Sequence, residues 1–140
     1  MTSVECINPN GDKQDWRCDR IAAPWGTDTP GPDAEWLFRK EFEAKPCTRA
    51  ILAITAQGVY EAEINGQVVG DHFMAPGWTS YDRRLQYQTY DVTDQLLCGR
   101  NCIGVRIAEG WFCGRIGFEG GHRNIWGPHP ALMAQLELQY

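Results

Sequence analysis

Apolar and polar residues alternate with a period of two along much of the chain from residue 35 onward, which is the pattern of half-buried β-strands. The first such run has aromatic residues on one parity and charged residues on the other: Trp36, Phe38 and Phe42 against Arg39, Glu41 and Glu43. Residues 48–56 are apolar on both parities, so we expect a central strand covered on both faces.

Residues 59–64 predict the next strand, because Tyr60, Ala62 and Ile64 alternate with two glutamates. The dipeptide Asn65-Gly66 follows directly. A type I′ turn requires positive φ at both central residues, and Asn and Gly tolerate that conformation best. The sequence therefore predicts a β-hairpin here, with a short return strand over residues 67–69.

Three further segments complete the pattern. Residues 87–92 predict a strand, followed by a short turn over 94–98 that Asp91 or Thr93 caps. Gly99, Arg100 and Asn101 have the composition of another turn. Alternation then resumes over 102–108, and again over 132–140, where the chain is expected to end in a strand.

This count gives seven or eight short strands, no helix longer than a turn or two, and no alternation of strands with helices. We therefore predict an all-β fold, a single antiparallel β-sandwich of the jelly-roll kind, over residues 34–140. Residues 1–33 are rich in Pro and Gly and show neither period. We expect them to form an irregular lead-in, which Trp16 and Trp25 fix to the domain surface.

Two loops collect most of the side chains suited to recognition, and they span residues 74–87 and 110–126. Loops on a β-scaffold commonly hold binding chemistry. The predicted ligand-binding or domain-docking residues are Trp78, Tyr81, Arg83, Tyr87, Trp111, Arg115, Asn124 and Trp126. Aromatic faces stack on sugar rings, while Arg and Asn bond hydroxyl groups. The same residue types also dominate protein interfaces, and some of these rings could be core residues.

Composition narrows the possible partners. A net charge of −5 and a pI near 5.1 leave no basic field, so we expect no nucleic-acid partner. No apolar run approaches the length of a membrane span, and no secretory signal opens the chain, so we expect a cytoplasmic protein without membrane contact. The six cysteines are expected to be free thiols, because their spacings match no zinc or redox motif.

No catalytic or metal-binding set emerges from the residues. Acidic residues near the two loops could supply a glycosidase pair, but solvated faces and turn caps explain them equally: Glu61, Asp71, Asp82, Asp91, Glu109 and Glu119. A Cys113–His122 pair lacks an orienting group. The three histidines are not at metal-ligand spacing, and the glycines of the second loop match no phosphate-binding motif. We therefore predict no catalytic residue, metal or cofactor.

Four linked motifs carry a family resemblance. They are G-x-Y-x-x-x-I-N-G at 58–66, A-P-G-W-T at 75–79, Y-Q-T-Y-D-V-T at 87–93 and G-W-F-x-G-R at 110–115. Together they make residues 36–140 resemble the amino-terminal β-sandwich of bacterial-type α-L-rhamnosidases, glycoside hydrolase family 78. The resemblance implies a galactose-binding-like sandwich.

In that family the hydrolytic carboxylates lie in a separate α/α-barrel domain, for which these 140 residues leave no room. The resemblance thus implies a noncatalytic module, whose partner is either a rhamnose-containing carbohydrate or the catalytic barrel. We expect no hydrolysis by the chain alone. Two alternatives stay open: a fragment of a complete α-L-rhamnosidase that hydrolyses terminal rhamnose, or a small enzyme that acts on a ligand in the aromatic pocket.

Overall fold

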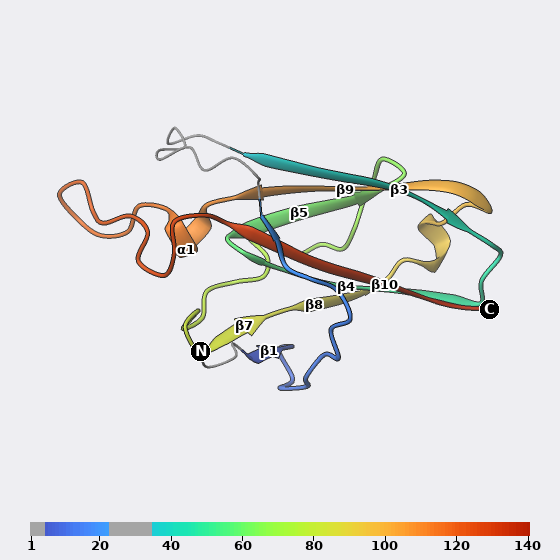
Figure 1. The fold of residues 1–140 in the computed structure, drawn as a ribbon, viewed down its shortest axis with the longest axis horizontal. Coiled ribbons are helices and arrows are strands. Elements are labelled where there is room, and N and C mark those ends of the chain that lie inside the picture. Colours follow the sequence, from blue (N-terminus) through green and yellow to red (C-terminus); the bar gives the residue numbers. More distant parts are fainter. Residues whose placement is uncertain (1–4, 23–34) are drawn as a thin grey trace.

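The computed structural model, which describes residues 5–22 and 35–140, shows two layers of β-sheet packed face to face (Figure 1). The elements are β1 (Glu5–Ile7), β2 (Ile21–Ala22), β3 (Trp36–Ala44), β4 (Arg49–Gln57), β5 (Val59–Ile64), β6 (Gln67–Val68), β7 (Arg84–Gln86), β8 (Gln88–Asp91), the 3₁₀-helix η1 (Thr93–Gln95), β9 (Gly99–Ala108), α1 (Gly110–Cys113) and β10 (Ala131–Gln139).

Each layer is an antiparallel sheet of four strands. One has the order β3-β9-β5-β6 and the other the order β2-β10-β4-β8. A separate parallel pair, β1 with β7, lies beside the second layer (Figure 1). The predicted fold class, an all-β sandwich in one domain, is confirmed.

The main core fills the space between the two layers. Leu52 and Ile54 of β4, Ile64 of β5 and Ile107 of β9 are almost completely buried there. The prediction that residues 48–56 form a central strand is confirmed, because β4 lies between β10 and β8 and is buried on both faces over most of its length. In β5, where the sequence does alternate with a period of two, the apolar parity is the one that enters this core.

The predicted hairpin is also confirmed. Asn65 has a φ of 53° and Gly66 a φ of 79°, as a type I′ turn requires, and Ile64 pairs with Gln67 across it. Asn65 does more than turn the chain. Its Nδ2 donates to the carbonyl oxygen of Gln95 at 2.9 Å, and its Oδ1 accepts from the backbone N–H of Cys102 at 3.0 Å. The turn is therefore bonded to the neighbouring strand β9.

Replacing Gly66 tests the backbone requirement separately from packing. A Cβ at this position would meet nothing within 4 Å, so the cost of Gly66→Ala comes from the left-handed backbone alone. We expect a loss of about 1 kcal/mol in the free energy of unfolding, measured by urea denaturation. Gly104→Ala is the matched control, because its site is equally open and its φ is not positive. Equal effects of the two substitutions would contradict this explanation.

One local prediction is wrong. Gly99, Arg100 and Asn101 do not form a turn but open β9, where they pair with Ala44, Glu43 and Phe42 of β3. The physical reason is the nine-residue ladder between these strands, together with the buried side chain of Asn101, which hydrogen-bonds the preceding segment. Long-range pairing here overrides the turn-like local composition.

The lead-in contributes two short strands, β1 and β2, which the sequence pattern did not reveal. Trp16 packs edge-on against Tyr87, with ring centroids 5.7 Å apart, so this ring of the lead-in contacts the domain. Trp25 lies outside the described residues. The boundary between residues 33 and 34 falls there as well, and it stays a prediction.

Candidate functional site

The two aromatic loops meet at one end of the sandwich. We call the cluster formed by Trp78, Tyr81, Trp111, Phe112 and Trp126 the aromatic end. The first two belong to the segment between β6 and β7, and the others to α1 and the loop after it, which lie at the opposite end of the sandwich from the C-terminus (Figure 1). Segments thirty residues apart in sequence thereby form one surface.

The rings contact one another in defined geometries. Trp78 stacks on Trp111 with centroids 6.2 Å apart and planes 5° apart, and Trp126 meets Trp78 edge-on, also at 6.2 Å. Beneath them, Tyr81 packs edge-on against Phe112 at 5.3 Å and against Trp126 at 5.2 Å. Such offset and edge-to-face contacts add to the stabilisation from area burial.

Exposure divides the aromatic end into a base and an outer layer. Tyr81 and Phe112 are buried together with Leu85 and Cys113, and they form a second small core. The Tyr81 hydroxyl donates to the Gly77 carbonyl oxygen at 3.2 Å, and burial raises the pKa of Tyr81 to about 12. Trp78, by contrast, remains 56% exposed, so a large apolar ring that contacts Trp111 and Trp126 lies at the surface.

The second loop is fixed at its base by polar contacts. Arg123 forms an ion pair with Glu109, and both side chains are mostly buried. The backbone N–H of Asn124 donates to the carbonyl oxygen of Cys113 at 3.1 Å. The buried Cys113 thiol has a pKa raised to about 12, chiefly by burial. It is therefore a packed, unreactive thiol at neutral pH.

The structure brings four of the eight predicted site residues together: Trp78, Tyr81, Trp111 and Trp126. Two more belong to the same loops but have different partners. The guanidinium of Arg115 donates to the carbonyl oxygens of Gly120 and Gly121, and Asn124 has a left-handed backbone conformation with a φ of 59°. Arg83 is exposed, and it follows the buried Tyr81 by two positions in the sequence.

Tyr87 does not join the aromatic end. It lies between β7 and β8, is 3% exposed, and packs on Trp16 of the lead-in. The sequence had grouped it with Trp78 because both belong to the same run of residues. Phe112 and Arg123, in turn, were not predicted as parts of the site, and Glu109 was named only as a possible glycosidase acid. The pairing of Glu109 with Arg123 could not be predicted, since no local pattern links residues fourteen positions apart.

Most of the acidic residues near the loops have structural partners. Oε2 of Glu61 lies 3.7 Å from Nη2 of Arg106, and Oδ1 of Asp71 lies 3.6 Å from Nδ1 of His72. Asp91 accepts hydrogen bonds from the N–H and hydroxyl of Thr93, which lower the pKa of that carboxyl. Within residues 5–22 and 35–140, no three His, Cys, Asp or Glu side chains are grouped to hold a metal ion. No helix in the described part of the chain is long and apolar enough to cross a membrane.

The fold and the aromatic end define a class, the β-sandwich modules whose loops present rigid aromatic side chains. The family profile of the Alpha-L-rhamnosidase N-terminal domain matches residues 45–140. The chain therefore belongs to the alpha-L-rhamnosidase N-terminal domain family, and the resemblance inferred from the four motifs is confirmed.

The alpha-L-rhamnosidases that this chain matches are much longer than the chain itself. An alpha-L-rhamnosidase of Streptomyces avermitilis is 43% identical over 94% of this chain and 13% of its own length. One from Formosa agariphila is 43% identical over 72% of this chain and 11% of its own length. The chain thus spans about an eighth of these curated relatives.

Two solved structures show the same fold within a whole enzyme. The native alpha-L-rhamnosidase of Aspergillus terreus matches with a TM-score of 0.81 and 50% identity, over 85% of this chain and 14% of that chain. The Streptomyces avermitilis enzyme complexed with L-rhamnose matches with a TM-score of 0.71 and 47% identity, over 76% of this chain and 10% of that chain.

Proposed function

We propose that this chain is a noncatalytic module of an alpha-L-rhamnosidase, and that its aromatic end docks onto the catalytic α/α-barrel domain of that enzyme. The observation that supports this most strongly is the half-exposed stack of Trp78 on Trp111, anchored on a buried base. Rigid tryptophans on a packed support are typical anchors of protein interfaces.

Further apolar side chains are exposed on the segment between β6 and β7 and on the loop after α1. Phe73 is 95% exposed, Phe118 is 96% exposed, and Met74 and Ile125 are each about half exposed. Several exposed apolar side chains on the two segments that form the aromatic end favour an interface over a free surface. The size of the relatives supports the same proposal, because most of each rhamnosidase lies outside the part that this chain matches.

A second candidate is recognition of a rhamnose-containing carbohydrate at the same place. The exposed ring of Trp78, with Arg83 nearby in sequence, offers a stacking face and a hydrogen-bond donor. A solved relative is complexed with L-rhamnose, which favours sugar chemistry in this family without assigning the sugar to this domain.

A chimera tests the docking proposal. The matching segment of the Streptomyces avermitilis enzyme is replaced by this chain, and hydrolysis of a chromogenic aryl α-L-rhamnoside is followed after heating. We expect the chimera to be active, the isolated chain to be inactive, and Trp78→Ser to shorten the chimera's half-life at elevated temperature roughly tenfold. Trp78 is 56% exposed in the isolated chain and lies outside the buried core, so we expect Trp78→Ser to leave the isolated domain folded.

Leu97→Ser is the matched control. Leu97 is 60% exposed and precedes β9, whereas α1 follows the other end of that strand, so the control removes similar apolar area far from the aromatic end. Equal heat resistance of the Trp78→Ser and unmodified chimeras would contradict docking. Saturable quenching of tryptophan fluorescence by L-rhamnose in the isolated chain, lost in Trp78→Ser, would instead favour the carbohydrate candidate.

A further inference from the structure

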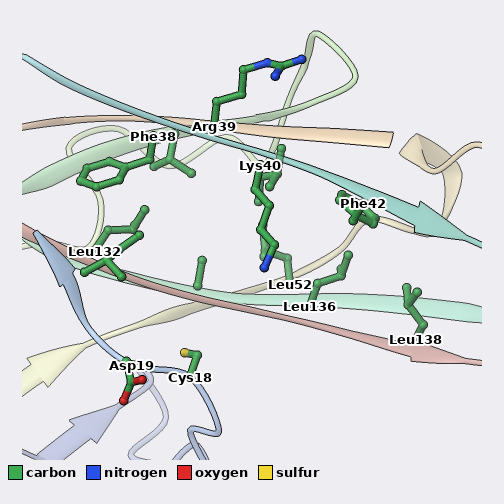
Figure 2. A pocket seen from close by; sticks show the side chains of 14 residues that line it. Cys18, Asp19, Phe38, Arg39, Lys40, Phe42, Leu52, Leu132, Leu136 and Leu138 are labelled. Atoms are coloured by element: carbon green, nitrogen blue, oxygen red, sulfur yellow. The ribbon is translucent and has the colours of Figure 1, made fainter. Parts of the chain in front are cut away.

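A groove opens along one side of the sandwich, away from the aromatic end, and the proposed function makes no use of it. It has a volume of about 620 Å³ and lies between β3 of one sheet and β10 of the other (Figure 2). Pockets that hold small organic ligands typically have ~300–1,000 Å³. The groove is therefore large enough for a ligand rather than for a few waters.

The topology explains why this side is open. Strand β3 is the edge of its sheet, and β2 covers β10 only at Ala131 and Leu132. Beyond that point no further strand of residues 5–22 or 35–140 joins the two layers on this side. The groove is consequently lined by core side chains that remain partly accessible, chiefly Phe38, Phe42, Leu136 and Leu138, above the buried Leu52.

Lys40 is the exception among these apolar residues. It lies between Phe38 and Phe42 on the inward parity of β3, whereas Arg39 and Glu41 bond each other on the outward parity. Figure 2 shows its side chain directed into the groove, toward Leu52 and Leu136. Lys40 forms no salt bridge with any residue of the described part of the chain.

An inward lysine on an edge strand also discourages pairing with other chains, and that role explains its charge. It does not explain an apolar space of this size, because protein interiors are otherwise closely packed. Asp19, on the opposite wall beside Cys18, places a negative charge at a second point of the rim (Figure 2). A ligand with one anionic group would therefore orient that group toward Lys40.

We propose that this groove binds an amphiphile, an aliphatic chain that carries a single carboxylate, with the carboxylate paired to the Lys40 ammonium. The chain then lies along Phe38, Leu136 and Leu138 and covers apolar surface that is otherwise exposed to water. The charge of Lys40 decides the class of ligand, because a neutral chain would gain the same burial but no ion pair.

Calorimetry with dodecanoate, kept below its micelle concentration, tests the site, and dodecanol is the uncharged comparison. We expect dodecanoate to bind, and Lys40→Met to weaken it about fivefold while leaving dodecanol binding unchanged. Lys40→Arg should restore dodecanoate binding. Ala134→Phe, which fills the groove, should weaken both ligands at least about tenfold. Lys45→Met, at an exposed position just after β3, is the charge-matched control and should change neither.

Two cysteines locate the bound chain independently of affinity. Cys18 lines the groove, whereas Cys98 is an exposed free thiol outside it. Dodecanoate should slow alkylation of Cys18 and leave Cys98 unaffected, as followed by peptide mass spectrometry. Binding of dodecanoate unchanged by Lys40→Met, or no protection of Cys18, would overturn the proposal. So would a dimer of the unmodified chain that Ala134→Phe converts to monomers, since a second copy would then occupy the groove.

Discussion

Replacing Asn101 by Leu is expected to lower the free energy of unfolding by about 3–4 kcal/mol, although the two side chains are similar in size. Asn101 is 1% exposed. Its Oδ1 accepts from Leu97 N–H and Asn65 Nδ2, each at 2.8 Å, and its Nδ2 donates to the carbonyl oxygens of Leu97 and Gly99. Leucine leaves these partners buried without hydrogen bonds, and their desolvation is then uncompensated.

Urea denaturation measures this effect, with Arg100→Ala as the control. Arg100 is the preceding residue of β9, but its exposed side chain is on the opposite face, so we expect a change within about 0.5 kcal/mol. The Asn101→Leu variant should also lose order in the Asn65-Gly66 turn, which Asn101 contacts directly. An unfolding free energy within about 1 kcal/mol of the unmodified chain would show that the buried network is not a stabilising feature.

The strands that could be predicted are those long enough to show a period of two. Strands β3, β5 and β10 each have six or more residues, and in each the apolar parity of the sequence is the one that faces the core, whereas β4 is apolar on both parities and is mostly buried on both faces. Strands β1 and β2 have three and two residues and cannot show a period. Asn101 shows the other kind of failure. Asparagine is common in turns because its side chain bonds nearby backbone groups, and Asn101 forms such bonds from inside strand β9.

The sequence predicted which two loops form the candidate site, because their tryptophan and tyrosine residues distinguish them from the other loops. The meeting of Trp78 with Trp111 depends on how two loops cross at the end of the sandwich, and no spacing in the sequence encodes that crossing. The inward position of Lys40, by contrast, could have been read from parity, since it shares the parity of Phe38 and Phe42. Whether the aromatic end binds a partner or a sugar stays a prediction.

Arg123→Met is the second substitution expected to have a large effect, because it breaks the Glu109–Arg123 ion pair that fixes the loop of residues 110–126 to the domain. In Arg123→Met the Glu109 carboxylate, whose side chain is 12% exposed, stays in a mostly buried position without its cation. We expect a loss of about 3 kcal/mol in the free energy of unfolding. The rings of Trp111 and Trp126 should become more mobile, because Arg123 precedes Trp126 on the same loop.

Urea denaturation measures the loss of unfolding free energy, and tryptophan fluorescence of the folded variant reports the mobility of the rings. Arg115→Met provides a matched control. Arg115 is an exposed arginine of the same loop whose guanidinium bonds two carbonyl oxygens and forms no ion pair with the described residues, so its loss should cost less than about 1 kcal/mol. The double variant Glu109→Gln with Arg123→Met should be more stable than Arg123→Met alone, since no unpaired charge remains. If the double variant is no more stable, the cost comes from lost packing of the Arg123 side chain, and the ion pair does not hold the loop that presents the aromatic end.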